Sequence, residues 1–235
     1  MGHEAKRLVV LGLMALAACG DNLAPDPFTG LVRVSGPSPF TANCAGSGQQ
    51  GHPYAGLEVE PSIAVDPKNA LHLVGAWQQD RWSNGGANGI GTAVSFDGGA
   101  TWTRSAPPFS RCTGGDVDNR GDYDRASDPW VTFAADGTVF EIALAFDAAT
   151  ARNAMLASRS NDGGLTWSDP AVLRADNDDD VFNDKNSITG DPKDPGRVYA
   201  VWDRLELPLG TVKSRLHNAL ETLRGDDRTK GYFEP

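Results

Sequence analysis

The octapeptide SFDGGATW, Ser95 to Trp102, decides the fold of this chain, because SNDGGLTW, Ser160 to Trp167, repeats its pattern S-x-D-G-G-x-T-W. A pattern this specific that occurs twice indicates a repeated supersecondary unit. The Asp side chain can accept hydrogen bonds from backbone N–H groups and fix a turn, and the Gly pair permits positive φ. We therefore predict a tight hairpin with a purely structural role at each copy. The residues expected to build the hairpins are Ser95, Asp97, Gly99, Thr101 and Trp102 in the first, and Ser160, Asp162, Gly164, Thr166 and Trp167 in the second.

These octapeptides resemble the Asp box, or bacterial neuraminidase repeat (BNR), of the sialidase superfamily. In that family the box lies on the hairpin between the outer strands of a β-propeller blade, away from the active site. The resemblance covers about residues 58–204 and implies a propeller fold. It does not imply activity, because Asp boxes also occur in propellers that are not sialidases.

Three segments of the chain begin alike, at Glu60, Ser127 and Lys185, and each reads as strand, turn, strand. Their β-branched and aromatic residues form nearly continuous apolar runs, which are typical of buried strands. The first two segments continue through a third strand, the octapeptide and a fourth strand. The expected strands are 62–65, 71–77, 91–96 and 101–105 in the first unit, 130–133, 139–146, 153–160 and 166–172 in the second, and 187–189 and 198–202 in the third.

The predicted fold class is therefore all-β, a partial β-propeller of about two and a half four-stranded blades, followed by a C-terminal α-helix. A propeller closes with about 4–8 blades. We expect this chain to be a propeller fragment; a ring completed by partner copies and a poorly stable remnant are the alternatives.

The N-terminus resembles a bacterial lipoprotein signal. Lys6 and Arg7 precede a short apolar run that ends in LAAC, a lipobox-like sequence with Cys19 as the expected lipidation site. We expect residues 1–19 to be the signal peptide and residues 20–57 a tether and leading segment. The protein is then exported and held at the bacterial cell envelope by a lipid anchor; a plain signal peptide is the alternative.

Composition and cysteine usage narrow the function classes. The formal net charge of −10 disfavours nucleic acid as a partner. Cys44 and Cys112 are expected to form a disulfide in an exported protein, with two free thiols as the alternative.

The loops offer few candidates for chemistry. Arg81 and Trp82, which are adjacent, are candidate binding residues for an anionic or sugar ligand. The alternative is a surface turn with Trp82 packed beneath it. Asp116, Asp118 and Asp122 are carboxylates of the kind that Ca²⁺ prefers, but their spacing matches no defined Ca²⁺ loop, so no metal site or cofactor is predicted. The family's early Arg-Ile-Pro signature and its late Tyr are missing, so no catalytic residue is assigned.

The last residues, 205–235, follow a different pattern. Apolar residues at helical spacing begin at Val212, after the candidate N-cap Thr211. The stretch PLGTVKSRL resembles the recognition helix of region four in extracytoplasmic-function sigma factors. That resemblance implies DNA contacts from Thr211, Lys213, Ser214 and Arg215. The helix that should precede it is absent, so a fused or mis-joined reading frame is the favoured explanation, with a simple packed helix as the alternative.

The sequence therefore predicts an exported, sialidase-like Asp-box propeller fragment that binds a ligand, such as a glycan, without catalysis. A truncated exo-α-sialidase-like glycoside hydrolase and a sigma-factor-like DNA binder are the two alternatives.

Overall fold

The computed structural model describes residues 31–47 and 49–206, and this part of the chain is all-β apart from one 3₁₀ turn, η1 (Arg111–Thr113). The expected lipidation site Cys19 and the sigma-like tail from residue 207 onward lie outside the described residues. Within the described part, no helix is long and apolar enough to cross a membrane.

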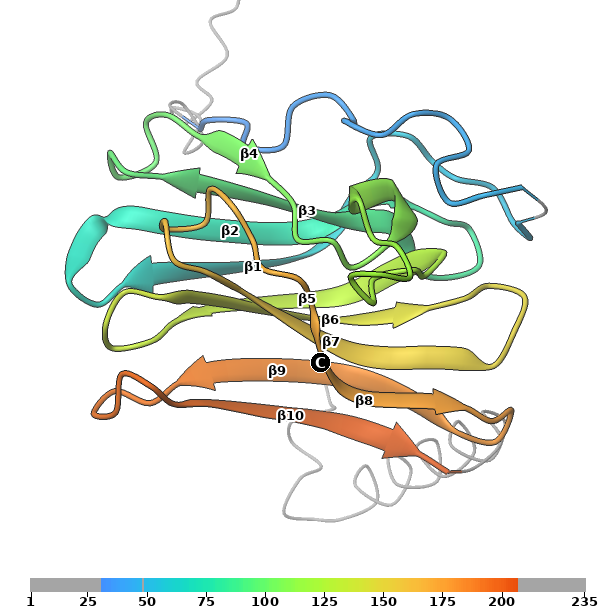
Figure 1. Ribbon diagram of the computed structural model, residues 1–235. Helices are drawn as coiled ribbons and strands as arrows, with labels where there is room; N and C mark the ends of the chain where they lie inside the picture. The colour runs from blue at the N-terminus through green and yellow to red at the C-terminus, as the bar shows by residue number, and fades with distance from the viewer. Residues whose placement is uncertain (1–30, 48, 207–235) are drawn as a thin grey trace, which may run out of the picture. The chain divides into compact units, whose positions relative to one another are not determined.

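In the part of the chain that the structure describes, ten strands form three consecutive units (Figure 1). Within each unit, neighbouring strands pair antiparallel. The first unit contains β1 (Glu58–Asp66), β2 (Asn69–Arg81), β3 (Ala87–Ser95) and β4 (Thr103–Ser105); the second contains β5 (Arg125–Phe133), β6 (Val139–Phe146), β7 (Arg152–Ser160) and β8 (Ala171–Asn177); the third contains β9 (Phe182–Gly190) and β10 (Val198–Leu205).

The first strand of each unit lies next to the first strand of the following unit. β1 contacts β5, and β5 contacts β9. A single bridge, between Ala87 and Ala126, also joins β3 to β5. We call β1, β5 and β9 the leading strands, because each opens its unit and together they bring three distant parts of the sequence side by side.

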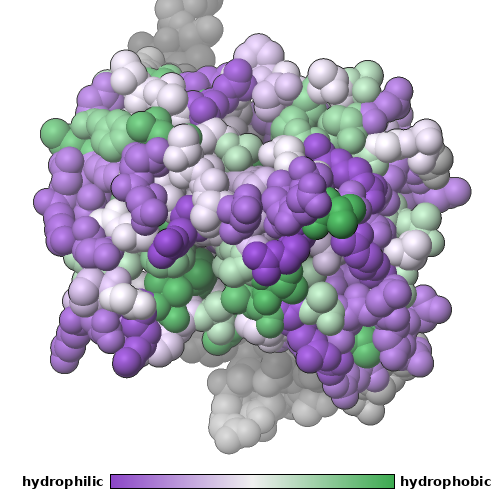
Figure 2. All heavy atoms as spheres, in the orientation of Figure 1, coloured by the Kyte–Doolittle hydropathy of each residue, from purple (hydrophilic) through white to green (hydrophobic). Residues whose placement is uncertain are grey.

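The core lies between the first two units. Every residue of β3 is buried, as expected for a strand that is covered on both faces. Val74 and Ile90 from the first unit pack in one cluster with Phe133 and Leu156 from the second. Hydrophilic side chains cover most of the face seen in Figure 2, and hydrophobic ones gather there in smaller patches.

The two octapeptides form equivalent turns, between β3 and β4 and between β7 and β8. In the first, Asp97 Oδ1 accepts from Thr101 N at 2.9 Å and Oδ2 from Thr101 Oγ1 at 2.6 Å. In the second, Asp162 accepts from the same atoms of Thr166 at 2.9 and 2.5 Å. These hydrogen bonds, those from the threonine side chains first, lower the pKa of each Asp to about 2.

These same bonds correct the predicted start of both fourth strands. We expected the strands to begin at Thr101 and Thr166, but they begin at Thr103 and Ala171. The reason is that the backbone N–H of each threonine is bound to an Asp side chain and is unavailable for strand pairing.

The second octapeptide also holds the two units together. His72 Nε2 lies 2.8 Å from the carbonyl oxygen of Gly163, and Ser105 Oγ donates to that of Gly164 at 2.6 Å. Trp167 donates from Nε1 to Ser105 Oγ at 3.1 Å, whereas Trp102 donates to Gly99 within its own turn.

A disulfide joins Cys44 to Cys112, with an S–S distance of 2.00 Å. It ties the segment that precedes β1 to the long connection between β4 and β5. This segment is also bonded to β2, since Asp80 accepts from Ser38 Oγ at 2.6 Å and from Gly56 N at 2.8 Å.

Candidate functional site

The three leading strands share an unusual backbone feature. Glu60, Asp128 and Lys185 have φ of 53°, 53° and 51°, in the left-handed region that residues other than glycine seldom adopt. Each lies at a break in the register with the neighbouring strand, where extra residues bulge out of the ladder. Bulges and strained residues of this kind concentrate at functional sites.

These bulges bring the three side chains into one polar network. Lys185 Nζ lies 2.8 Å from Asp128 Oδ2, and Ser127 Oγ donates to Asp128 Oδ1 at 2.6 Å. Gln78 donates from Nε2 to Glu60 Oε2 and, at 3.0 Å, to Ser127 Oγ. We call this network the leading-strand cluster; its members are Glu60, Gln78, Arg81, Ser127, Asp128 and Lys185.

The cluster is open to solvent at one side. Glu60 and Lys185 are exposed, Arg81 and Asp128 are half-buried, and Gln78 and Ser127 are buried beneath them. The exposed members can therefore meet a ligand, while the buried members hold them in place.

The pKa values of the two carboxyl groups move in opposite directions. Loss of water, followed by the neighbouring carboxyl group of Asp128, raises the pKa of Glu60 above its ordinary value. Burial acts to raise the pKa of Asp128 as well, but the hydrogen bonds from Lys185 and Ser127 and the positive charge of Lys185 act against it, and the pKa of Asp128 is lowered. One carboxyl is thus kept ionised and the other is kept protonated to higher pH.

Arg81 and Trp82 do not form the predicted ligand-binding pair, because their side chains have separate partners within the protein. Trp82 is 7% exposed, and its Nε1 donates to Asn88 at 2.8 Å. The cation over its ring is Arg125, at 4.1 Å from the ring centroid. Arg81 instead donates to Gln78 Oε1 at 3.0 Å, because successive side chains of a strand point to opposite faces.

Arg125 is the largest fully buried side chain among the described residues. Its guanidinium donates to Gln50 O at 2.6 Å and to Gly85 O at 2.8 Å. Burial lowers its pKa to about 10. Because its acceptors are carbonyl and amide oxygens of two loops, Arg125 fastens the segment before β1 to the β2–β3 turn, a role that the sequence analysis did not predict.

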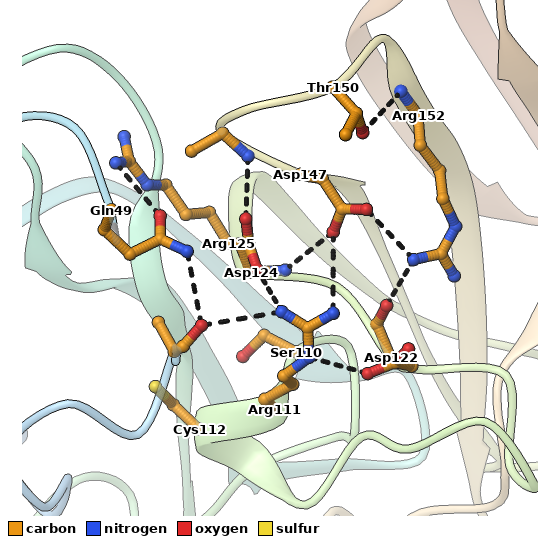
Figure 3. A network of polar contacts seen from close by, with 12 residues as sticks. Gln49, Ser110, Arg111, Cys112, Asp122, Asp124, Arg125, Asp147, Thr150 and Arg152 are labelled. Carbon is orange, nitrogen blue, oxygen red and sulfur yellow. Dashed lines mark hydrogen bonds and ion pairs between the residues drawn. The ribbon is translucent and has the colours of Figure 1, made fainter. Parts of the chain in front are cut away.

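The carboxylates of the loop before β5 bind arginine. Figure 3 shows the Arg111 guanidinium between Asp122, Asp124 and Asp147, with Arg111 Nε 2.6 Å from Asp122 Oδ1. Arg152 lies 3.1 Å from Asp147 on the other side. Asp122 is therefore paired with arginine and is not available for a Ca²⁺ site with Asp116 and Asp118. Within residues 31–47 and 49–206, no group of three His, Cys, Asp or Glu side chains could hold a metal ion.

The expected leading strands, 62–65, 130–133 and 187–189, begin four or five residues later than β1, β5 and β9 do, so Glu60, Asp128 and Lys185 fell outside them. The available signal was the acidic residue before proline at the same point of two units, Glu60-Pro61 and Asp128-Pro129, with Lys185 at the matching point of the third. Proline restricts the preceding residue, and this marks the place where each ladder is interrupted.

Comparisons with known proteins yield structural likeness only. No family model matches the sequence, and no curated protein matches it. The structure is similar to an α-L-arabinanase of Penicillium chrysogenum complexed with arabinobiose, with 15% identity, a TM-score of 0.44, and coverage of 75% of this chain and 51% of that one. It is also similar to the Hadza microbial sialidase Hz136, with 20% identity, a TM-score of 0.39, and coverage of 49% and 26%. An α-L-arabinofuranosidase of Fusarium graminearum has 14% identity and a TM-score of 0.39, with coverage of 64% and 45%. The chain thus spans about half, or less, of the length of these structures.

Proposed function

We propose that this chain is a propeller-type binding module whose leading-strand cluster holds the hydroxyl groups of a glycan without hydrolysing it. The observation that carries the proposal is the triple bulge. Three units of the chain each place a residue with strained backbone, Glu60, Asp128 or Lys185, at the same point of the leading strand. Their side chains belong to one network of hydrogen bonds, in which Gln78 and Ser127 connect Glu60 to Asp128 and Lys185. A left-handed conformation costs a non-glycine residue about 1 kcal/mol or more, so repetition at three equivalent positions favours a role beyond folding.

The chemistry of the cluster suits a polyhydroxylated ligand. Carboxylate, amide, hydroxyl, ammonium and guanidinium groups offer both donors and acceptors within one small area. Trp130, two residues after Asp128 on β5, is 46% exposed. A few converging polar groups near an aromatic surface are typical of small-molecule sites.

Binding without hydrolysis is favoured over the hydrolase alternative because the early Arg-Ile-Pro signature of the sialidase family is missing from the sequence. We expect purified protein to release no fluorophore from a fluorogenic sialoside. Steady turnover that disappears in the Glu60→Gln variant would favour the hydrolase.

The proposal extends to the cell envelope through Cys19, the lipobox cysteine. A lipid chain there would place the module at the membrane surface and leave the cluster free for extracellular glycans. Labelling of cells with radioactive palmitate should mark the protein and leave the Cys19→Ser variant unmarked. A sigma-like DNA-binding role for the tail is the remaining alternative, and a saturable gel shift lost in Arg215→Ala would support it.

A glycan array probed with the full-length protein tests binding directly. We expect selective retention on one group of glycans and its loss in Lys185→Met. The matched control is Lys193→Met, which removes the same charge from the exposed turn between β9 and β10. An array without any retained glycan, or equal losses in both variants, would contradict the proposal.

A further inference from the structure

His72, near the start of β2, has a hydrogen-bonding partner at each nitrogen of its ring. Nδ1 lies 3.1 Å from Asp66 Oδ2, at the end of β1, and Nε2 lies 2.8 Å from the carbonyl oxygen of Gly163. The imidazole side chain is 8% exposed, so little water can reach it to replace either partner. Because Gly163 belongs to the second octapeptide, this ring joins the first unit to the second.

The two partners require a proton on both ring nitrogens. A carbonyl oxygen and an ionised carboxylate only accept hydrogen bonds, whereas a neutral imidazole has a single N–H. Imidazole is also a stronger base than a carboxylate, with ordinary pKa values of about 6.5 and about 3.9, so the proton between His72 and Asp66 lies on Nδ1. The imidazolium form therefore satisfies both partners at once, and its charge is paired with that of Asp66.

The packing around the ring suits a cation that approaches Gly163 closely. Phe96 stacks on the imidazole with the ring centroids 4.6 Å apart, and the face of an aromatic ring attracts a positive charge. Phe133 packs at 76° to the imidazole. A Cβ added at Gly163 would lie 2.9 Å from Nε2 of His72, so the glycine of the octapeptide permits the short contact.

The charged groups next to these contacts are mainly negative. Asp97 follows Phe96 in the β3–β4 turn, and Asp162 precedes Gly163 in the β7–β8 turn. The β5–β6 turn approaches the Asp66 carboxylate through Gly137 and carries Asp136. Lys68, between β1 and β2, is the cation of these turns, and it is exposed. Hydrogen bonds lower the pKa values of Asp97, Asp136 and Asp162, so these carboxyl groups stay ionised and favour a positive imidazole.

We propose that His72 is a pH-sensitive clamp between the first two units, in which the imidazolium donates to Asp66 and Gly163 together and loss of one proton releases Gly163. The remaining proton stays on Nδ1, because a hydrogen bond to a carboxylate is stronger than one to a neutral carbonyl. The lone pair of Nε2 then faces the Gly163 oxygen and repels it. The contact is thus present at low pH and is lost as pH rises.

The opening is local. Ser105 Oγ still donates to the carbonyl oxygen of Gly164 at 2.6 Å, and this bond contains no group that titrates near neutral pH. The two units therefore remain joined when His72 loses its proton, and only the tip of the second octapeptide turn separates from β2.

NMR of the imidazole nitrogens in the isotope-labelled full-length protein tests the number of protons on the ring. His52 is exposed and serves as the reference within the same sample. At the pH where His52 has become neutral, both ring nitrogens of His72 should still have the chemical shifts of an imidazolium. A His72 ring that is already neutral at that pH, with a lone pair on one nitrogen, would overturn the proposal.

The Asp66→Asn variant distinguishes the clamp from a histidine that only fills space. The asparagine oxygen can accept from Lys68 N as Asp66 does, and its amide can donate to Nδ1, which leaves a neutral ring with its proton on Nε2 for Gly163. The carbonyl carbon signal of Gly163 should therefore move as pH rises in the wild type and stay nearly constant in Asp66→Asn. Asp162 has a pKa of about 2, so its own titration does not disturb the signal in this range.

The matched control is Asp136→Asn, which removes an exposed carboxylate from the β5–β6 turn and should behave as the wild type does. Equal movement of the Gly163 signal in wild type and Asp66→Asn would overturn the proposal, as would a constant signal in the wild type. Amide spectra check that each variant folds. If Asp66→Asn does not fold, the ring nitrogens of the wild type still decide.

Discussion

Replacement of Glu141 by glutamine should flatten the pH dependence of stability. Glu141, on β6 of the second unit, is fully buried. Its Oε2 accepts from Thr92 Oγ1 on β3 at 2.9 Å, while Oε1 is buried without a partner in the described part of the chain. Burial raises the pKa of Glu141 to about 8 from an ordinary value of 4.5. A neutral carboxyl group therefore lies between the first two units.

The magnitude follows from proton linkage. Between pH 4.5 and 8 the folded state keeps a proton that the unfolded state has lost, so the free energy of unfolding falls as pH rises through this window. Each pH unit within the window costs about 1.4 kcal/mol. Between pH 5 and 7.5 this single group removes about 3 kcal/mol from the free energy of unfolding. Glutamine cannot ionise, so Glu141→Gln lacks this loss.

Urea denaturation at pH 5, 6, 7 and 7.5 measures the effect. The amide of Glu141→Gln brings buried donors of its own, and their cost of about 1–3 kcal/mol does not vary with pH, so the slope and not the absolute stability is diagnostic. Asp118→Asn, which removes an exposed carboxylate, is the control and should keep the wild-type slope. Parallel curves for wild type and Glu141→Gln would refute the reasoning.

Three further outcomes are expected. The double variant Cys44→Ser, Cys112→Ser should lose about 4 kcal/mol of unfolding free energy in urea, because the disulfide closes a loop across a separation of 68 residues. A loss near zero would contradict this stabilising role of the disulfide. Asp162→Ala should lower the melting temperature more than Asp97→Ala, because only the second octapeptide accepts hydrogen bonds from the other four-stranded unit; equal decreases would contradict this difference. Arg125→Met should speed amide hydrogen exchange at Tyr54 and Ser83. The N–H groups of these two residues bond the segment before β1 to the end of β2 and the β2–β3 turn. Unchanged exchange would show that Arg125 does not hold that segment in place.

The strands and turns of this fold were predictable because their causes are local. The Asp97 and Asp162 turns depend on residues within eight positions, and the apolar runs of β2 and β6 appear in the sequence directly. The starts of β4 and β8 were placed wrongly, since the threonine N–H groups bond to aspartate side chains that sequence periodicity does not register.

The cluster was not predictable because its members meet only after three units align. Glu60, Asp128 and Lys185 are far apart in sequence, and their positive φ values appear only in the folded backbone. The partner of Trp82 was missed for the same reason, as the cation over its ring comes from Arg125 on another unit.

The most direct test of the central claim, that the leading-strand cluster is the ligand site, is calorimetric titration of Asp128→Asn with the glycan that the array selects. Asp128 holds the cluster together because Ser127 and Lys185 donate to its two carboxylate oxygens. The matched control is Asp136→Asn, which alters an exposed carboxylate in the β5–β6 turn. We predict an affinity loss of roughly tenfold or more for Asp128→Asn, corresponding to about one charge-assisted hydrogen bond, and wild-type affinity for Asp136→Asn. Wild-type affinity in Asp128→Asn would contradict the account.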